Sequence, residues 1–128
     1  MRFIFLVYDH TDGEALTRRM SVRQKHLEEA LPDKRSGFIV SGGAILDSHE
    51  VSAAPTMDSE ILAKANTDAL FFSRLQTKNM LGSSMVFDAN SEKEVWDRIH
   101  RDIYCTAKVW NMDNCQLIPI IDGFKGLV

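Results

Sequence analysis

The fold is decided by the stretch RFIFLVYDHTDGEALTRRMSVRQKHLEEALPDKRSGFIVSGGAIL, residues 2–46, which has the pattern of a strand, a helix and a second strand. Residues 2–8 are a short apolar run that predicts a buried strand. Residues 37–46 alternate loosely, are partly β-branched, and predict a second strand that is bent or bulged at its glycines.

The helix between these strands has two competing start signals, the capping boxes Thr11-x-x-Glu14 and Ser21-x-x-Gln24. The first predicts one long helix to about Leu31, and the second predicts a short turn before the main helix. Pro32 and Gly37 are expected to end the helix in either case. The apolar stripe that should face the sheet on the helical period comprises Leu16, Met20, Leu27 and Leu31.

The second half of the chain repeats this order. Residues 83–89 predict a third strand, and the capping box Ser91-x-x-Glu94 predicts the start of a second helix. Residues 115–121 predict the last strand, in which Pro119 indicates a sheet edge or a strand end. Residues 48–81 are an insertion that contains a helix-like ILAKANTDAL, and we expect it to act as a lid or as a dimer contact.

The resulting β-α-β-(insertion)-β-α-β order is typical of the ferredoxin-like α+β fold, a four-stranded antiparallel sheet with both helices on one face. Residues 1–128 are expected to form a single domain, because a chain of this length can close one hydrophobic core. The other face of the sheet has no helix, so we expect a homodimer that covers it.

The composition is that of an ordinary globular protein, with 45% hydrophobic residues, 26% charged residues and a formal net charge of −3. No basic stripe is present, so we expect no nucleic-acid partner. The apolar run at residues 3–8 is too short for a membrane span or a secretory signal, which favours a soluble, cytoplasmic protein without a membrane partner.

Cys105 and Cys115 are expected to be free thiols. The lack of CxxC, HExxH and glycine-rich phosphate motifs indicates neither a metal nor a cofactor.

The basic segment RRMSVRQKHL, residues 18–27, contains the first candidate site residues. Arg23 lies within the apolar stripe, where a guanidinium needs a carboxylate or the mouth of a cleft, because an unpaired buried charge is costly. Arg19 and His26 lie together on the flank of this stripe. Arg23 can equally extend to solvent or make a structural ion pair, and His26 can be a structural residue.

A carboxylate beside His26 would make it a general acid or base, since the carboxylate fixes the tautomer and raises the basicity of the imidazole. Asp9 ends the first strand, and Asp47 ends the second strand at the same edge of the sheet. We favour Asp9, because the hydrophobic strand carries it directly to the helix-covered edge. Either aspartate can also be a turn residue.

Four further residues are candidates for the wall of a pocket. Ser41, Gly42 and Gly43 would expose backbone N–H groups that can bind a carboxylate or an oxyanion, unless they only form a β-bulge. Tyr104 follows the second helix and would either wall the site or pack at a dimer interface. Trp110 is expected to pack.

These segments together resemble the YCII-related (YciI-like) family, small proteins of the dimeric ferredoxin-like α+β class. The opening strand ends in Asp9, RRMSVRQKHL matches the family pattern R-x-x-S-V-R-x-x-H-L, and SGGAILD stands in place of A-G-P-x-x-x-D. GSSMVFDANSEKEV matches at the third strand, DIYCTAKVW stands in place of D-P-Y-x-x-A-G-V, and QLIPI matches the last strand. Two prolines of the family patterns are Gly43 and Ile103 here.

The resemblance implies a homodimer whose pocket holds a His–Asp pair, mapped to His26 and Asp9. We therefore expect a cofactor-independent lyase or isomerase that acts on a small phenolic, quinoid or lactone-type substrate. His26 would move a proton, Asp9 would orient His26, and Arg19 and Arg23 would bind an anionic oxygen. Two alternatives stay open: a non-catalytic module that binds a small anion, and a dimeric interaction protein with apolar surface in residues 48–81.

Overall fold

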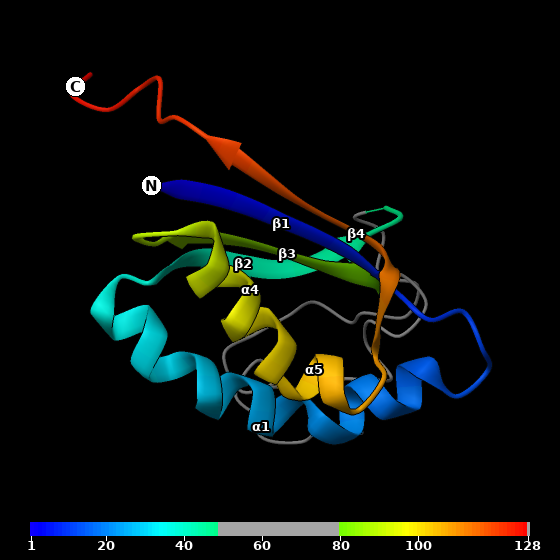
Figure 1. The fold of residues 1–128 in the computed structure, drawn as a ribbon. Helices are drawn as coiled ribbons and strands as arrows, with labels where there is room; N and C mark the ends of the chain where they lie inside the picture. Colours follow the sequence, from blue (N-terminus) through cyan, green and yellow to red (C-terminus); the bar gives the residue numbers. More distant parts are fainter. Residues whose placement is uncertain (49–79, 128) are drawn as a thin grey trace, which may run out of the picture.

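The computed structural model describes residues 1–48 and 80–127 (Figure 1). In order along the chain, the elements are β1 (Arg2–Asp9), α1 (Ala15–Ser36), β2 (Ile39–Leu46), β3 (Met80–Asp88), α4 (Glu92–Arg101), α5 (Ile103–Thr106) and β4 (Trp110–Ile120). The expected insertion at 48–81, with its helix-like segment and its role as a lid or dimer contact, falls almost entirely on residues 49–79, outside the described residues.

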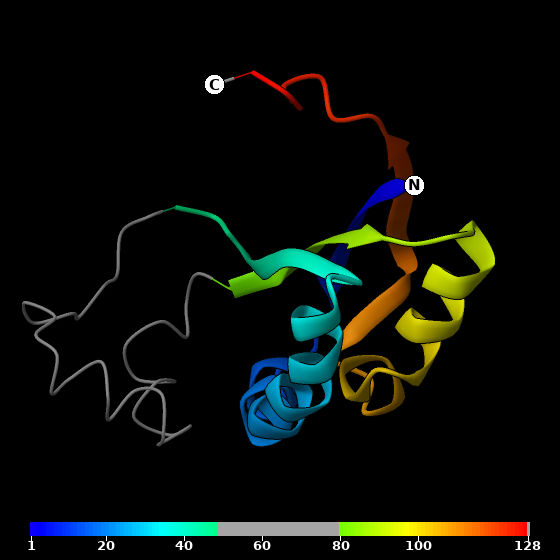
Figure 2. The same cartoon turned by 90° about the vertical axis from the view of Figure 1, so that its left-hand side faces the viewer.

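The four strands form one sheet in the order β2-β3-β1-β4, and every neighbouring pair is antiparallel. β1 and β2 both pair with β3, so they run in the same direction and end at the same edge of the sheet. The three helices cover one face of the sheet, and the other face carries none of them (Figures 1 and 2). This arrangement confirms the expected ferredoxin-like α+β fold. β4 is an edge strand, as Pro119 indicated.

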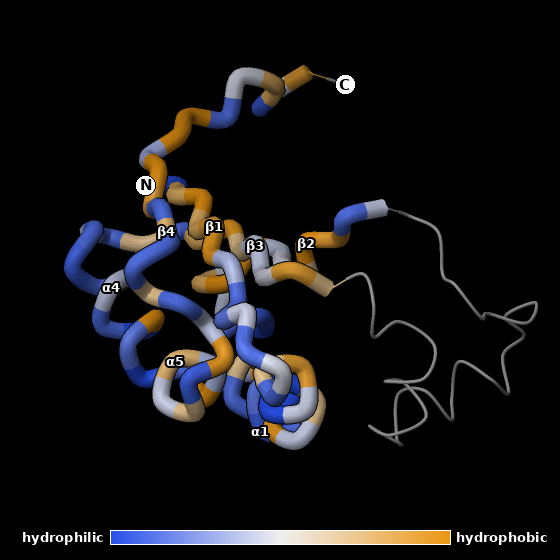
Figure 3. Tube along the Cα trace, turned by 90° about the vertical axis from the view of Figure 1, so that its right-hand side faces the viewer, coloured by the Kyte–Doolittle hydropathy of each residue, from blue (hydrophilic) through white to orange (hydrophobic). Residues whose placement is uncertain are grey.

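The core lies between the sheet and the helices. Alternate side chains of β1 point toward the helices, which buries Phe3, Phe5 and Val7. Hydrophobic residues follow the strands in Figure 3, and hydrophilic residues dominate α4. The buried core cluster consists of Phe3, Phe5, Val7, Ile39, Met85, Phe87, Ala89, Val95, Ile99, Tyr104, Val109 and Trp110.

The helix-free face of the sheet also carries apolar side chains, and these are less covered. Ile4 and Leu6 on β1 are half-buried, whereas Tyr8 and Ile118 are 45% and 39% exposed. Ile4 pairs with Ile118 across β1 and β4, so the two side chains lie on the same face.

α1 is one long helix, as the first of the two start signals predicts. It begins at Ala15, and no side-chain cap forms at Glu14. The Asp12 carboxylate accepts the Glu14 N–H at 3.0 Å instead. Ser21 lies inside the helix, where its hydroxyl donates to the Arg18 carbonyl, so the second start signal is wrong.

The expected end of α1 at Pro32 is also wrong, because Pro32 lies inside the helix. A proline this close to a C-terminus removes only one backbone hydrogen bond, and the next residue, Asp33, is held by an ion pair to Arg98. The helix ends at Gly37 as predicted. Gly37 has a φ of 86° and donates its N–H to the Lys34 carbonyl, a conformation that favours glycine.

Only part of the apolar stripe predicted for α1 is buried, because Met20 is 5% exposed but the leucines that follow it are not covered. Leu27 and Leu31 are 43% and 47% exposed, whereas Arg19 is buried. Arg19, His26 and Asp33 are spaced seven residues apart, which places them on one face of the helix. Each of the three has a charged partner on another part of the chain, and those ion pairs hold this polar face against the protein.

The remaining boundaries differ modestly from expectation. Ser91 caps α4 as predicted, since its hydroxyl accepts the Glu94 N–H at 3.2 Å. β3 and β4 begin at Met80 and Trp110, earlier than predicted, because polar and small residues in these segments mask the strand pattern. The irregularities of β2 lie between Ile39 and Ser41 and next to Leu46, not at the glycines.

Candidate functional site

A cavity of about 520 Å³ lies between α1 and the strands β2 and β3. The polar residues of α1 and α5 form one part of its wall, and aliphatic residues form the rest. Among the described residues the lining includes no aspartate and no glutamate. The titratable side chains that line it are Arg19, Arg23, His26, Lys34 and Tyr104.

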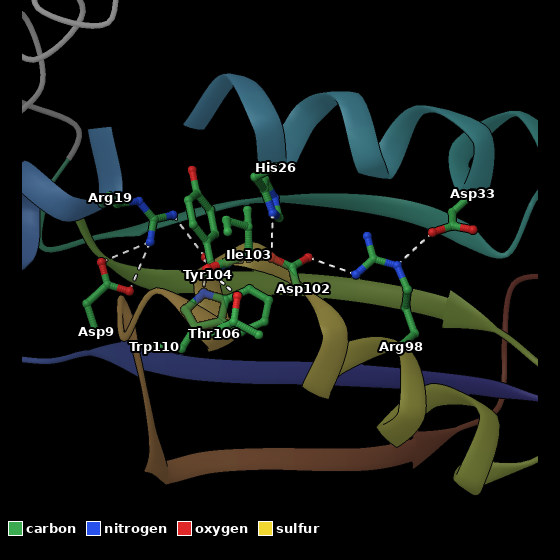
Figure 4. Close-up of polar contacts among 11 residues, drawn as sticks. Asp9, Arg19, His26, Asp33, Arg98, Asp102, Ile103, Tyr104, Thr106 and Trp110 are labelled. Carbon is green, nitrogen blue, oxygen red and sulfur yellow. Dashed lines mark hydrogen bonds and ion pairs between the residues drawn. The ribbon is translucent and has the colours of Figure 1, made fainter. Parts of the chain in front are cut away.

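Arg19 is fixed by a buried ion pair behind the cavity wall. Its Nη1 lies 2.9 Å from both carboxylate oxygens of Asp9, and the two side chains are only 5% and 9% exposed. Its Nη2 donates to the Ser83 hydroxyl at 2.9 Å, and the indole N–H of Trp110 donates to the same oxygen at 3.0 Å (Figure 4). Ser83 Oγ therefore accepts two hydrogen bonds, which leaves its own O–H as a donor.

The charge state of Asp9 reflects two opposing effects. Burial raises the pKa of the Asp9 carboxyl, and the charge of Arg19 offsets part of that increase. The Asp9 carboxylate holds Arg19 in place, and His26 pairs with a different carboxylate. The expected pairing of His26 with Asp9 is replaced by another one, because α1 is turned so that Arg19 projects toward the end of β1.

His26 pairs with a carboxylate that follows α4. Its Nδ1 lies 2.9 Å from Oδ1 of Asp102, and the side chains are 14% and 0% exposed. The imidazole stacks on the Tyr104 ring, with 3.9 Å between the centroids and 14° between the planes. The Arg19 guanidinium lies 4.8 Å from the centroid of the same ring. Since Asp102 accepts at Nδ1, the Nε2 atom of a neutral His26 carries the lone pair.

Asp102 is the centre of a buried polar chain (Figure 4). Its Oδ1 also accepts the Tyr104 N–H at 2.8 Å, and its Oδ2 accepts Nη1 of Arg98 at 2.9 Å. Nε of Arg98 donates to Asp33 on α1 at 2.6 Å. Burial alone would raise the pKa of Asp102, but His26, the Tyr104 N–H and Arg98 outweigh it and hold this pKa below its ordinary value.

The structure brings most of the predicted site residues to the cavity and leaves others outside it. Ser41 is exposed on β2 and does not line the cavity, and Asp47 is exposed just after β2. Trp110 packs in the core, where it is 1% exposed. The predicted residues that line the cavity are Arg19, Arg23, His26, Gly42, Gly43 and Tyr104.

Sequence reasoning missed Ser83, Arg98 and Asp102. Two local signals point to Asp102: it caps the short helix α5, and it follows Arg98 by four residues. Ser83 carries no such signal, because its role depends on two side chains far away in the sequence.

Comparison with known proteins gives distant similarities. No protein-family model matches the chain. The chain is 21% identical over 110 residues to the aspercryptin biosynthesis cluster protein B of Emericella nidulans, and the match covers 86% of the chain and 57% of that relative's length. It is also similar to the structure of 5-chloro-2-hydroxyhydroquinone dehydrochlorinase (TftG) from Burkholderia phenoliruptrix AC1100, in complex with 2,5-dihydroxybenzoquinone. That match has a TM-score of 0.63 and 21% identity, and covers 96% of each chain.

No helix in the described part of the chain is long and apolar enough to cross a membrane.

Proposed function

We propose that this chain is a lyase or isomerase of the YCII-related kind that transfers a proton on a small phenolic, quinoid or lactone-type substrate. The observation that carries the proposal is the His26–Asp102 pair in the wall of a cavity whose charged lining is basic. In this proposal residues 1–128 act as one domain, and His26 is the catalytic acid or base.

The chemistry that these residues support is proton transfer. With Nδ1 bound to Asp102, the Nε2 lone pair of His26 can take a proton from the substrate. In an elimination, the electrons of the bond from which His26 removes the proton form a new double bond. The leaving group departs with the electron pair of its own bond to the substrate. In an isomerisation, the proton returns to another atom of the same molecule. Both steps balance without an oxidant or a reductant, so the proposal requires no redox cofactor.

Negative charge that develops on a substrate oxygen would be stabilised by donors in the same wall. Arg19 is held rigidly by Asp9, and the O–H of Ser83 is left as a donor by its two incoming hydrogen bonds. Preorganised donors of this kind stabilise a developing oxyanion without reorganisation during the reaction. Arg23 also lines the cavity and would add positive charge.

The structural neighbour supports the reaction class. TftG is described as a dehydrochlorinase of 5-chloro-2-hydroxyhydroquinone, bound to 2,5-dihydroxybenzoquinone. Elimination from a hydroxylated ring is the chemistry that we propose for the cavity here. The sequence segments that resemble the YCII-related family lie on the elements that build the cavity, which favours the same kind of site.

A second candidate function is a non-catalytic module that binds a small anion. The absence of acidic residues from the described cavity lining favours it, since any anion would meet only basic partners there. The two functions differ in the role of His26: catalysis requires the imidazole, whereas anion binding depends mainly on the arginines.

The test is a turnover and binding screen. Phenols, quinones, lactones and chlorinated hydroxyhydroquinones are screened first by thermal shift, and the compounds that bind are then assayed for chloride release or a spectral change. His26→Ala should lower turnover by about 10²–10⁴-fold, the range typical of a general acid or base. Asp102→Asn should lower it as well, because the imidazole loses its orienting carboxylate.

The matched control is His100→Ala, since His100 is an exposed histidine on α4 outside the cavity lining. It should leave turnover unchanged. Turnover that survives His26→Ala excludes the proposed acid–base role. A ligand that binds both the native chain and His26→Ala, without turnover in either, would favour the anion-binding module.

We further propose that the chain works as a homodimer formed through the helix-free face of its sheet. Ile4, Leu6 and Ile118 offer apolar surface there, and a second copy of the same face would cover it.

A further inference from the structure

The cavity extends along α1 well beyond His26. Its lining residues on this helix run from Arg19 to Lys34, which the helical rise of 1.5 Å per residue places roughly 22 Å apart. Lys34 follows His26 by eight residues, or about 12 Å along the axis. A cavity of roughly 150 Å³ is sufficient for a benzene ring. A single ring beside His26 would therefore leave most of the 520 Å³ unfilled.

The two parts of the cavity have different chemistry. Near the N-terminal half of α1 the wall carries the polar side chains Arg19, His26 and Ser83, beside the apolar Ala44 and Met80 of β2 and β3. Beyond His26 the side chains of the wall are mainly aliphatic and include Leu27, Ala30, Leu31, Ile39 and Met85.

Two of these aliphatic residues are largely exposed. Leu27 and Leu31 are 43% and 47% exposed, although they lie one helical turn apart beside a cavity. Apolar surface of this kind is best covered by an apolar part of a ligand.

Lys34 lies at the far end of this aliphatic part. It is exposed, and it makes no ion pair with any of the residues described here. No acidic residue of the described chain lines the cavity, so the charged side chains described there that a negative group would meet are all basic. An ammonium at the end of an apolar groove suits a carboxylate at the end of an aliphatic chain.

We infer that the natural ligand of this cavity is an elongated amphipathic anion. Its hydroxylated ring or enol head lies beside His26 and Arg19, and its aliphatic arm runs along Leu27 and Leu31 to a carboxylate near Lys34. The identity of the reacting head rests on the proposed function. The arm and its terminal charge rest only on the shape and the lining of the cavity.

Affinity measurements test the aliphatic arm independently of the ring. Isothermal titration calorimetry is run with resorcinol, hexylresorcinol and the corresponding dihydroxyphenyl-hexanoic acid. Hexylresorcinol should bind at least tenfold more tightly than resorcinol, since several methylene groups leave water. The acid should bind more tightly than hexylresorcinol. Leu31→Ser should weaken both arm-bearing ligands and leave resorcinol unchanged.

The terminal charge is tested with a matched pair of lysines on α1. Lys34→Met keeps the aliphatic stem and should abolish the preference for the acid over hexylresorcinol. Lys25→Met, at an exposed position that does not line the cavity, should retain that preference. Equal affinity for resorcinol and hexylresorcinol, no saturable binding of any of the three, or an equal effect of the two lysine variants overturns the inference.

The same measurements on His26→Ala distinguish this inference from the proposed function. If the variant keeps the preference for the long acid, the inferred ligand class stands even when no turnover is found. If turnover depends on His26 but affinity does not depend on the arm, the proposed function stands and the inferred ligand class is wrong.

Discussion

Asp102→Asn tests the buried polar chain most directly. The Asp102 carboxylate accepts hydrogen bonds from His26, Arg98 and the Tyr104 backbone, and it has no donor of its own. Asparagine has almost the same shape, but it presents an NH₂ group in place of one carboxylate oxygen. This group must face either Arg98 or the Tyr104 N–H, neither of which can accept, so a contact between two donors replaces a hydrogen bond.

The size of the effect follows from burial. Asp102 is 0% exposed and Arg98 is 2% exposed, so water cannot solvate the groups that lose their partner. Removal of one member of a buried ion pair costs about 3–5 kcal/mol of unfolding free energy. Arg98 keeps its second carboxylate, Asp33, at 2.6 Å. We therefore expect a loss near the lower limit, about 3 kcal/mol.

The assay is urea denaturation followed by circular dichroism. The control is Asp97→Asn, which removes a carboxylate of α4 that is 62% exposed and pairs with Lys93. The control should leave the urea midpoint unchanged, because solvent screens an exposed pair. A midpoint for Asp102→Asn equal to that of the native protein would refute the idea that the buried polar chain around Asp102 holds α1 in place.

The pH dependence of the difference in unfolding free energy between the native chain and Asp102→Asn provides a second test. The pKa of Asp102 in the folded chain lies below its ordinary value of 3.8. The stabilising effect of this carboxylate is therefore complete above the unfolded pKa and disappears as the pH falls through the folded pKa. The difference in unfolding free energy between the native chain and Asp102→Asn should be constant at neutral pH and shrink in acid below 3.8. A difference that grows in acid would contradict this account.

Three other sites give comparably direct tests. Gly82→Ala should strongly lower the urea midpoint, because a Cβ there would collide with the backbone of β1, whereas Gly43→Ala, whose Cβ would meet open space, should not. Arg19→Ala should cost about 3 kcal/mol of unfolding free energy, because it leaves a carboxylate buried alone. Arg18→Ala removes a partly exposed pair and should have a much smaller effect in the same denaturation assay. Ile118→Asp should convert the proposed dimer into a folded monomer in light scattering, and a persistent dimer would contradict the proposed sheet-to-sheet contact.

The fold was predictable from the sequence because its signals are local. The apolar run that forms β1, the Ser91 cap of α4 and Pro119 on an edge strand each follow from short-range pattern. The start of β4 was not predictable in this way. An edge strand needs apolar residues on only one side, and Asp113 and Asn114 are exposed there.

The orientation of α1 was not predictable from hydrophobic periodicity. That method assigns charged residues to solvent and leucines to the core, and here Arg19 is buried while Leu27 and Leu31 line an open cavity. The choice of Asp9 as the partner of His26 failed for another reason: Asp9 does end β1, but its carboxylate there pairs with Arg19. The seven-residue spacing of Arg19, His26 and Asp33 was visible in the sequence, but its meaning depends on partners that only the fold brings together.

The polar face of α1 also has a consequence for the width of the cavity. A helix that docks through leucines can rotate or slide by small amounts at little cost, because apolar contacts are not directional. α1 is instead attached at three points along its length, to Asp9, Asp102 and Arg98, by contacts of 2.6–2.9 Å. A shift by one helical turn of about 5.4 Å would break all three contacts together. These three contacts therefore fix the gap between α1 and the strands β2 and β3, so the width of the cavity is preformed before any ligand binds.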